Sequence, residues 1–268
     1  MSSQKNSPLR PIITLLTDFG NEESYAGVMR GVILGIAPRA RVVDLCHGIP
    51  PQDIVTGAFV LATSYRYFPP GTLHVVVVDP GVGSERALLA IESEGQRFLG
   101  PDNGILGGVL QGQPPVRAVR LENRQYFLTP LSHVFHGRDI LAPAAAHLAR
   151  GLPLEELGPA FKEPLPLPWP QPRRGAGGAL YGEMILGDHF GNCVSNIELA
   201  EGSRGRVELP GGKVVELCDH YAQVEPGEPL ALRGSSGYLE VAVRNGSALQ
   251  SLAMERGSPV VWHEERVE

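Results

Sequence analysis

The chain has 268 residues, with 23 basic and 29 acidic side chains and a formal net charge of −6. This length predicts two modest domains or one large one, and the negative balance argues against nucleic acid as a partner. Hydrophobic residues make up 43% of the chain and charged residues 19%, which excludes a disordered, highly charged protein. Glycine (33) and proline (24) both exceed average usage, so a helical bundle is excluded as well.

The lack of a recognisable targeting signal and the pattern of cysteines both favour a cytoplasmic protein. Residues 1–10 carry no apolar signal-peptide core, and no stretch reaches 18 uncharged apolar residues, so we expect no membrane association. Three cysteines, Cys46, Cys193 and Cys218, are an odd number without C-x-x-C spacing. We expect three buried thiols in a reducing compartment, with no disulfide and no zinc ribbon.

The first half of the sequence alternates short apolar runs with amphipathic segments. It predicts strands at 12–17, 41–46, 73–78, 87–91, 97–100 and 116–121, and helices at 24–36, 53–65 and about 137–150. The run at 73–78 is mostly valine, as in parallel strands covered on both faces. An α/β sheet with a parallel centre follows, and Pro143 makes the beginning of the last helix irregular.

A proline-rich segment separates the two halves. Five prolines fall among residues 162–173, which favours extended polyproline geometry and predicts an inter-domain linker. Beyond it, glycines separate short alternating runs that predict strands at 182–186, 206–209, 213–217, 238–243 and 258–262. We therefore expect an α/β domain over 1–161 and a smaller all-β domain, a barrel or a sandwich, over 174–268.

Acidic residues follow the predicted parallel strands, at the sheet edge where open α/β sheets bind ligands. Asp18 comes after the first strand, Asp44 lies just inside the end of the second, and Asp79 comes after the valine strand. A carboxylate at such a position accepts hydrogen bonds from ribose hydroxyls. The alternative for each is a helix N-cap or a turn acid.

Common nucleotide and nucleophile signatures are missing. The segment 81–86 approaches the dinucleotide fingerprint, but Arg86 stands where the third glycine belongs and a strand follows instead of a helix. Neither a P-loop nor a G-x-S-x-G elbow occurs. The sequence therefore argues against NAD binding, P-loop phosphoryl transfer and serine hydrolysis.

Metal and thiol chemistry are also disfavoured. His133, His136 and Asp139 have a spacing that could place metal ligands on one side of a helical turn. However, Gly137 interrupts that segment and H-E-x-x-H is absent, so we predict no metal. Cys46 is followed directly by a histidine, but adjacent residues rarely bring their reactive atoms together, which favours a buried cysteine.

The second half offers two polar segments between predicted strands. In the first, Asp188 could receive an ammonium group, while Phe190 or Asn192 could stack on or hydrogen-bond a flat heterocycle. The alternative is an Asx-type turn. In the second, Ser235 and Ser236 supply hydroxyls suited to a carboxylate, or form a plain loop.

Taken in order, these segments resemble the S-adenosylmethionine (SAM) hydroxide adenosyltransferases. This family is also called the SAM hydrolases and is related to fluorinases and chlorinases. The resemblance covers nearly the whole chain after residue 10. It rests on Thr-Asp-Phe-Gly at 17–20, Tyr25 with Gly27, Asp-Pro-Gly-Val-Gly-Ser at 79–84 with Arg86, Gly-Pro-Asp-Asn-Gly at 100–104, Phe-His-Gly-Arg-Asp at 135–139, the segment 188–192, and Ser-Ser-Gly at 235–237 with Leu239 and Glu240.

The resemblance implies a fold, an assembly and a reaction. The fold would be an N-terminal Rossmann-like α/β domain followed by a C-terminal β-barrel domain. The assembly would be a homotrimer with active sites between the N-domain of one subunit and the C-domain of its neighbour. The reaction would be attack of water or hydroxide on the ribose 5′ carbon of SAM, which yields adenosine and L-methionine. SAM would be the substrate, and no cofactor would be needed.

The resemblance also implies roles for individual residues. Asp79, Arg86 and His136 would hold and activate the water, with either Asp79 or His136 as the proton acceptor. The substrate-binding residues would be Asp18 for the ribose hydroxyls, Asp188 for the methionine amino group, Ser235 or Ser236 for its carboxylate, Phe190 with Asn192 for the nucleoside side, and Tyr25, Phe135 and Glu240 as further contacts. Glu23 and His189 depart from the family pattern.

Two alternatives remain at this stage. A halogenase that uses chloride or fluoride is disfavoured by Asp79, because a carboxylate would repel a halide but can accept a proton from water. The insertion found in fluorinases is also absent between Arg86 and His136. The second alternative is a non-catalytic sensor of adenosine or SAM, for which Arg86 and His136 would not be needed.

Overall fold

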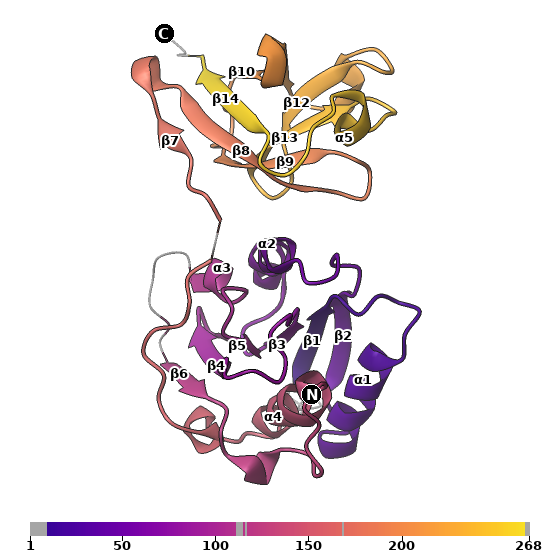
Figure 1. Cartoon of the computed structure of the whole chain (residues 1–268), viewed down its shortest axis with the longest axis vertical. Coiled ribbons are helices and arrows are strands. Elements are labelled where there is room, and N and C mark those ends of the chain that lie inside the picture. Colours follow the sequence, from indigo (N-terminus) through magenta and orange to yellow (C-terminus); the bar gives the residue numbers. More distant parts are fainter. Residues whose placement is uncertain (1–9, 111–114, 116, 168, 266–268) are drawn as a thin grey trace, which may run out of the picture. The chain divides into compact units, whose positions relative to one another are not determined.

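The computed structural model describes residues 10–110, 115, 117–167 and 169–265. The chain divides into two compact units, residues 1–168 and 169–268 (Figure 1). The boundary falls inside the segment 162–173 that the sequence predicts as a linker. The N-terminal segment 1–9, Val116 at the start of a predicted strand, and residue 168 of the predicted linker lie outside the described residues.

The N-terminal unit is built on a mixed six-stranded sheet. Its strand order is β2-β1-β3-β5-β4-β6, where the first four are parallel and β4 runs antiparallel to both β5 and β6. The strands are β1 (Ile12–Thr17), β2 (Arg41–Cys46), β3 (Leu73–Val77), β4 (Leu88–Ser93), β5 (Gln96–Pro101) and β6 (Arg117–Arg120). This arrangement confirms the α/β class with a parallel centre.

Helices cover both faces of this sheet (Figure 1). They are α1 (Tyr25–Ile36), α2 (Ile54–Ser64), α3 (Gly107–Leu110) and α4 (Ala142–Ala149), with short turns η1 (Tyr65–Tyr67), η2 (Arg124–Tyr126), η3 (Gly137–Leu141) and η4 (Leu154–Leu157). Side chains of a strand alternate between the two faces. Thus Ile13 and Leu15 pack with α1 and α4, whereas Leu16 packs with α2 and α3.

The predicted helix at 137–150 is in fact two structures. A π-helical turn, η3, occupies 137–141, and the regular helix α4 begins only at Ala142. Pro143 is the reason, because proline has no N–H to donate to the carbonyl four residues earlier. That carbonyl, of Asp139, instead accepts a hydrogen bond from the Leu128 amide at 2.9 Å.

The C-terminal unit is a closed barrel. Hydrogen bonding runs around the ring β14-β10-β11-β12-β13-β9-β8 and returns from β8 to β14, so seven strands close and β7 extends from β8. The strands are β7 (Arg173–Arg174), β8 (Leu180–Gly187), β9 (Cys193–Glu198), β10 (Gly205–Glu208), β11 (Val214–Cys218), β12 (Pro229–Arg233), β13 (Tyr238–Val243) and β14 (Pro259–Glu264). The short helical segments are η5 (Ala176–Gly178), η6 (Pro210–Gly212), η7 (Tyr221–Gln223) and α5 (Ala248–Ser251). Closure leaves no exposed edge around the ring and buries Trp262 inside it.

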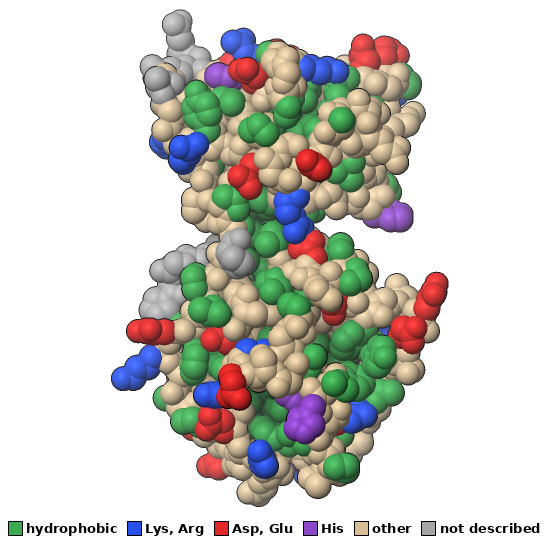
Figure 2. All heavy atoms as spheres, viewed as in Figure 1, with side chains coloured by type: hydrophobic (Ala, Val, Ile, Leu, Met, Phe, Trp, Pro, Cys, Tyr) green, Lys and Arg blue, Asp and Glu red, His purple; other side chains and the backbone are tan. Residues whose placement is uncertain are grey.

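The surface of the described residues agrees with the composition. On the face drawn in Figure 2, acidic and basic side chains are scattered among each other over both units. No described helix has the length and hydropathy needed to cross a membrane.

Candidate active site

The topology of the N-terminal unit places a cavity at the carboxyl ends of β1 and β3. The connection from β1 to β2 passes through α1 on one face, and the connection from β2 to β3 passes through α2 on the other. Since β1 lies between β2 and β3, the chain changes direction between β1 and β3, which is where open α/β sheets bind ligands. A cavity of about 290 Å³ opens there, lined by Asp18, Phe19, Gln52, Val77, Asp79, Pro80, Val82, Val134, Phe135, His136 and Gly137.

Three polar side chains from distant parts of the sequence form one cluster at this cavity. Nε of Arg86 donates to both carboxylate oxygens of Asp79, at 2.8 and 2.9 Å, and Nη2 of the same guanidinium also donates to Asp79. Nη2 of Arg86 lies 3.0 Å from Nδ1 of His136. The side chains of Arg86 and Asp79 are only 10% and 5% exposed. The guanidinium therefore joins the carboxylate to the imidazole in a largely desolvated site.

The protonation of His136 follows from this geometry. Burial and the Arg86 guanidinium lower the pKa of His136, against the opposing influence of the Asp79 and Asp139 carboxylates. The ring is therefore neutral at pH 7. Because arginine can only donate, Nδ1 of His136 must accept, which puts the ring proton on Nε2.

Two glycines hold the segments of this cluster close together. Gly83 has φ +83°, and a Cβ there would lie 2.6 Å from the carbonyl oxygen of His133. Gly137 follows His136 directly, and a Cβ there would lie 3.2 Å from Sδ of Met29. Larger residues would push the 79–86 loop away from the 132–136 segment, or lift His136 from the sheet.

Asp18 is oriented by the loop that follows β2. Its Oδ2 accepts a hydrogen bond from the backbone N–H of Gln52 at 2.8 Å. Within the described part of the chain, Oδ1 of Asp18 has no hydrogen-bond partner and can accept from a ligand. Gln52 adopts φ +66°, a backbone region that costs a non-glycine residue energy, and lines the same cavity. Gln52 was not predicted as a site residue, because its contribution is a backbone amide.

An aromatic group borders the cavity. The ring of Tyr25 lies 5.4 Å from that of Phe19 and 5.3 Å from that of Phe135, and Phe19 and Phe135 are themselves 5.8 Å apart. Phe19 and Phe135 line the cavity, whereas Tyr25 packs against them and is 47% exposed. The structure thus places Phe135 at the cavity and Tyr25 beside it.

The C-terminal unit holds the other candidate residues. Oδ1 of Asp188 accepts from the amides of Phe190 and Asn192, and its Oδ2 accepts from the Asn192 side chain at 2.9 Å. Asp188 therefore shapes the turn between β8 and β9, as the Asx alternative proposed. Phe190 projects from that turn and is 75% exposed, so its ring is available for stacking.

A second carboxylate lies near Asp188. Burial and the Asp188 charge raise the pKa of Glu240, whose carboxyl group packs against the Gly234 backbone beside Ser235 and Ser236. Ser235 is exposed and Ser236 half-buried. A bound cation would offset the repulsion that the Asp188 charge exerts on an ionised Glu240. This corner of the barrel therefore suits an ammonium group.

Other residues considered from the sequence have different roles. Asp44 does not line the cavity and instead pairs with Arg30 and His47. Asp139 is 1% exposed and accepts from Arg138 and from the Ser132 amide at 2.8 Å, so it anchors the segment before His136. Among the described residues, no group of three or more His, Cys, Asp or Glu side chains could hold a metal ion.

The two folds and the Asp79–Arg86–His136 cluster define a class: an α/β unit with a hydrogen-bonded carboxylate–guanidinium–imidazole cluster at its cavity, followed by a closed β-barrel. The family model described as the SAM hydroxide adenosyltransferase N-terminal domain matches residues 13–158, and the model of the C-terminal domain matches 182–261. The chain belongs to the SAM hydroxide adenosyltransferase family, as the sequence motifs indicated.

Individual relatives agree with this assignment. A (R)-S-adenosyl-L-methionine hydrolase of Thermus thermophilus is 39% identical over 263 residues, which cover 94% of this chain and 99% of the relative. A fluorinase of Actinoplanes sp. is 28% identical over 89% of this chain and 92% of its own. The crystal structure of an uncharacterized conserved protein from Thermotoga maritima matches with a TM-score of 0.85 and 34% identity, over 93% of this chain and 99% of that one.

Proposed function

We propose that this protein is a SAM hydrolase that converts S-adenosyl-L-methionine and water to adenosine and L-methionine. The observation that carries the proposal is the hydrogen-bonded Asp79–Arg86–His136 cluster at a cavity whose other polar wall is Asp18. The higher identity to the Thermus hydrolase than to the Actinoplanes fluorinase supports hydrolysis over halogenation. The Thermus hydrolase is named for the (R) sulfonium epimer of SAM, and we propose the same preference here.

The nucleophile is a water molecule held by the cluster. Nε2–H of His136 donates to the water oxygen, while Arg86 fixes both His136 and Asp79. The water oxygen forms a bond to the 5′ carbon as the bond from that carbon to sulfur breaks, and the electron pair leaves with methionine. The proton released by water passes to Asp79, since the only lone pair of the His136 ring already accepts from Arg86.

Alignment supplies most of the rate enhancement. The sulfonium makes methionine a good neutral leaving group, so the enzyme mainly has to hold a poor nucleophile in line with the bond that breaks. Such placement can contribute roughly 7 to 11 kcal/mol, and a general base typically adds about 10² to 10⁴ in rate. No cofactor takes part in this scheme, because SAM is the substrate and carries its own leaving group.

Substrate groups are assigned to residues by their chemistry. Asp18 accepts from the ribose hydroxyls through its unpartnered Oδ1. In the barrel unit, the methionine ammonium binds Asp188 and Glu240, and it offsets the repulsion between the Asp188 charge and an ionised Glu240. The remaining contacts are Ser235 or Ser236 for the methionine carboxylate, Phe190 and Asn192 for the nucleoside, and Tyr25 with Phe135 at the N-terminal cavity.

A product assay tests the proposed reaction. Purified protein is incubated with (R)-SAM or (S)-SAM in halide-free buffer, and the products are separated by chromatography. We expect adenosine and methionine in equal amounts, faster from (R)-SAM. Absence of adenosine above a heat-inactivated control would refute hydrolysis and favour the sensor alternative, while chlorinated adenosine after addition of chloride would identify a halogenase.

We also propose a cytoplasmic homotrimer with active sites at the subunit interfaces. The assigned substrate residues are divided between the N-terminal unit and the barrel unit, and both carry highly exposed apolar side chains, Val134 at 77% and Phe190 at 75%. All three cysteines are free thiols, which suits the reducing cytoplasm, although only Cys193 is buried and the expectation of three buried thiols was wrong for Cys46 and Cys218. Light scattering at micromolar concentration should give three times the 28.8 kDa mass of one chain, and a monomer would refute the assembly.

A further inference from the structure

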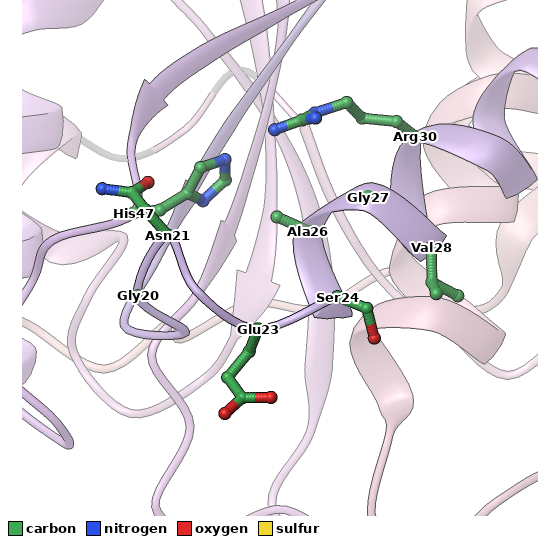
Figure 3. A pocket seen from close by; sticks show the side chains of 9 residues that line it. All are labelled: Gly20, Asn21, Glu23, Ser24, Ala26, Gly27, Val28, Arg30 and His47. Atoms are coloured by element: carbon green, nitrogen blue, oxygen red, sulfur yellow. The ribbon is translucent and has the colours of Figure 1, made fainter.

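The segment that carries Asp18 contributes to two separate hollows. Asp18 and Phe19 line the candidate active-site cavity, whereas Gly20 and Asn21 line a second hollow of about 350 Å³ beside α1. Figure 3 shows Arg30 extending from α1 toward the ring of His47 in this second hollow. His47 is only 5% exposed, and the reaction proposed above does not use it.

A continuous hydrogen-bond chain leads from α1 to the Asp18 segment. Arg30 donates to both oxygens of Asp44, at 2.9 and 2.7 Å, and Nε2 of His47 lies 3.0 Å from Oδ1 of Asp44. Oγ1 of Thr17 lies 2.8 Å from Nδ1 of His47. Oγ1 of Thr17 also accepts from the Phe19 amide at 3.2 Å.

Chemistry fixes the direction of the hydrogen bonds at Asp44 and at the Phe19 amide. Burial alone would raise the pKa of Asp44, but the hydrogen bonds from His47 and Arg30 outweigh it and lower the pKa, so the carboxylate is ionised and only accepts. Nε2 of His47 must therefore donate to Asp44, while Nδ1 of the same ring shares a hydrogen bond with the Thr17 hydroxyl. Because a backbone amide can only donate, Thr17 presents a lone pair of Oγ1 to the Phe19 amide.

As a result, each of the three consecutive backbone amides at residues 18–20 donates a hydrogen bond. The Asp18 amide donates to the carbonyl of Val77 at 3.4 Å, the Phe19 amide to Thr17, and the Gly20 amide to the carbonyl of His47 at 2.8 Å. His47 thus holds the segment twice, through its ring by way of Thr17 and through its own backbone. Its loop continues to Gln52, whose amide holds the Asp18 carboxylate.

We propose that Thr17, His47, Asp44 and Arg30 form a positioning relay that fixes Asp18 for the nucleoside. The relay rests on the proposed function in one respect, that Asp18 binds the ribose of SAM. Its members touch no reacting atom, so they are positioning residues. Asp44, which the sequence suggested as a second ribose acid, is on this view the anchor that aligns His47.

The chain offers a matched control for a test of the relay. Thr14 lies on the same strand as Thr17, both are buried, and its Oγ1 is also 2.8 Å from Nδ1 of a buried histidine, His74. The His74 ring continues to Gln96 and not to the cavity. Thr17→Val and Thr14→Val therefore remove the same group from equivalent environments, and Thr17→Ser keeps the hydroxyl.

Two readouts are measured on the full-length protein: steady-state kinetics with SAM and hydrogen exchange of the amides at 18–20. We expect Thr17→Val to lower kcat/KM by about tenfold, mainly through KM, and to speed exchange by about tenfold, as for one lost hydrogen bond. Thr17→Ser should restore both values to within about threefold. Thr14→Val should change neither kcat/KM nor the exchange rate by more than about twofold. This should hold even if Thr14→Val lowers the melting temperature as much as Thr17→Val does.

The outcomes separate the relay from the proposed function. Equal changes in both valine variants, or an unchanged Thr17→Val protein, would overturn the relay even if the wild-type protein hydrolyses SAM. If the wild-type protein does not hydrolyse SAM, the proposed function fails. The exchange measurement still decides in that case whether Thr17 and His47 hold the Asp18 segment.

Discussion

Replacement of Arg86 by lysine tests the central cluster most directly. Arg86→Lys keeps a positive charge beside the buried Asp79, so it avoids the several kcal/mol that an unpaired buried carboxylate would cost. A lysine ammonium is a point charge without the planar fork of arginine, so it cannot hold Asp79 and reach Nδ1 of His136 in the same geometry. The variant therefore loses the contact that orients His136.

The size of the effect follows from that lost contact. A hydrogen bond from a charged donor is worth about 1.5 to 3 kcal/mol, which corresponds to roughly 10- to 150-fold in rate at 1.36 kcal/mol per factor of ten. We expect kcat to fall by this factor while KM changes little, because the contact acts on the nucleophile and not on SAM.

The assay is adenosine formation at saturating and limiting SAM, with Arg117→Lys as the matched control. Arg117 also bridges two acids, Glu92 and Glu155, but its side chain is 50% exposed, at the start of β6. The control should stay within about twofold of wild type. The reasoning is refuted if Arg86→Lys keeps its kcat within twofold, or if KM rises while kcat is unchanged.

Further predictions concern His136, Gly83 and His74. His136→Gln, which can still donate an N–H, should keep about a tenth of wild-type kcat, whereas His136→Ala should keep less than about a hundredth; equal losses would make His136 the base instead. Gly83→Ala should lower kcat at least tenfold, since its Cβ would overlap the His133 carbonyl, and unchanged kinetics would contradict that packing. Burial lowers the pKa of His74 from its ordinary value of 6.5, so in acid the unfolded chain binds a proton that the native protein does not. The stability that this group contributes is therefore complete above pH 6.5 and is lost as the pH falls through the lowered pKa. His74→Gln should flatten the acid limb of the wild-type unfolding free energy by up to about 1.4 kcal/mol per pH unit, and an equal slope in both proteins would argue against His74.

Strand periodicity was a reliable guide where burial follows a simple pattern. The predicted strands at 12–17 and 41–46 coincide with β1 and β2 because each is a short apolar run bounded by turns. The sequence sets no bounds for β9, although a strand is expected to begin after residue 192, and β12 is not predicted at all; both shortfalls have physical reasons. In β9 the polar Ser195 and Asn196 are buried beside apolar neighbours, so the sequence lacks the alternation of polar and apolar residues that indicates a strand. Strand β12 begins with Pro229, and proline argues against a strand because it has no N–H for the sheet hydrogen bonds.

The candidate site was only partly visible in the sequence. Asp79 and Asp18 could be found from strand ends alone, but Arg86 and His136 lie 50 residues apart, and only the family motifs connected them. Gln52 contributes a backbone amide and an unusual φ, which its side-chain type does not reveal. His47 joins a threonine 30 residues away inside the core, where one sequence offers no signal of the pairing.

The arrangement of charge also accounts for water rather than halide as the nucleophile. Nε and Nη2 of Arg86 are already engaged by Asp79 and His136, so these two nitrogens are not available to hold a halide. The Asp79 and Arg86 charges balance, His136 is neutral, and the remaining Asp18 carboxylate gives the cavity wall a net negative charge. Such a wall attracts the sulfonium and repels chloride or fluoride, whereas neutral water can enter and lose its proton only once it is inside. Chloride added to the wild-type enzyme should therefore leave adenosine as the nucleoside product. Asp79→Asn should remove the proposed proton acceptor and slow hydrolysis, without making halide transfer the faster reaction.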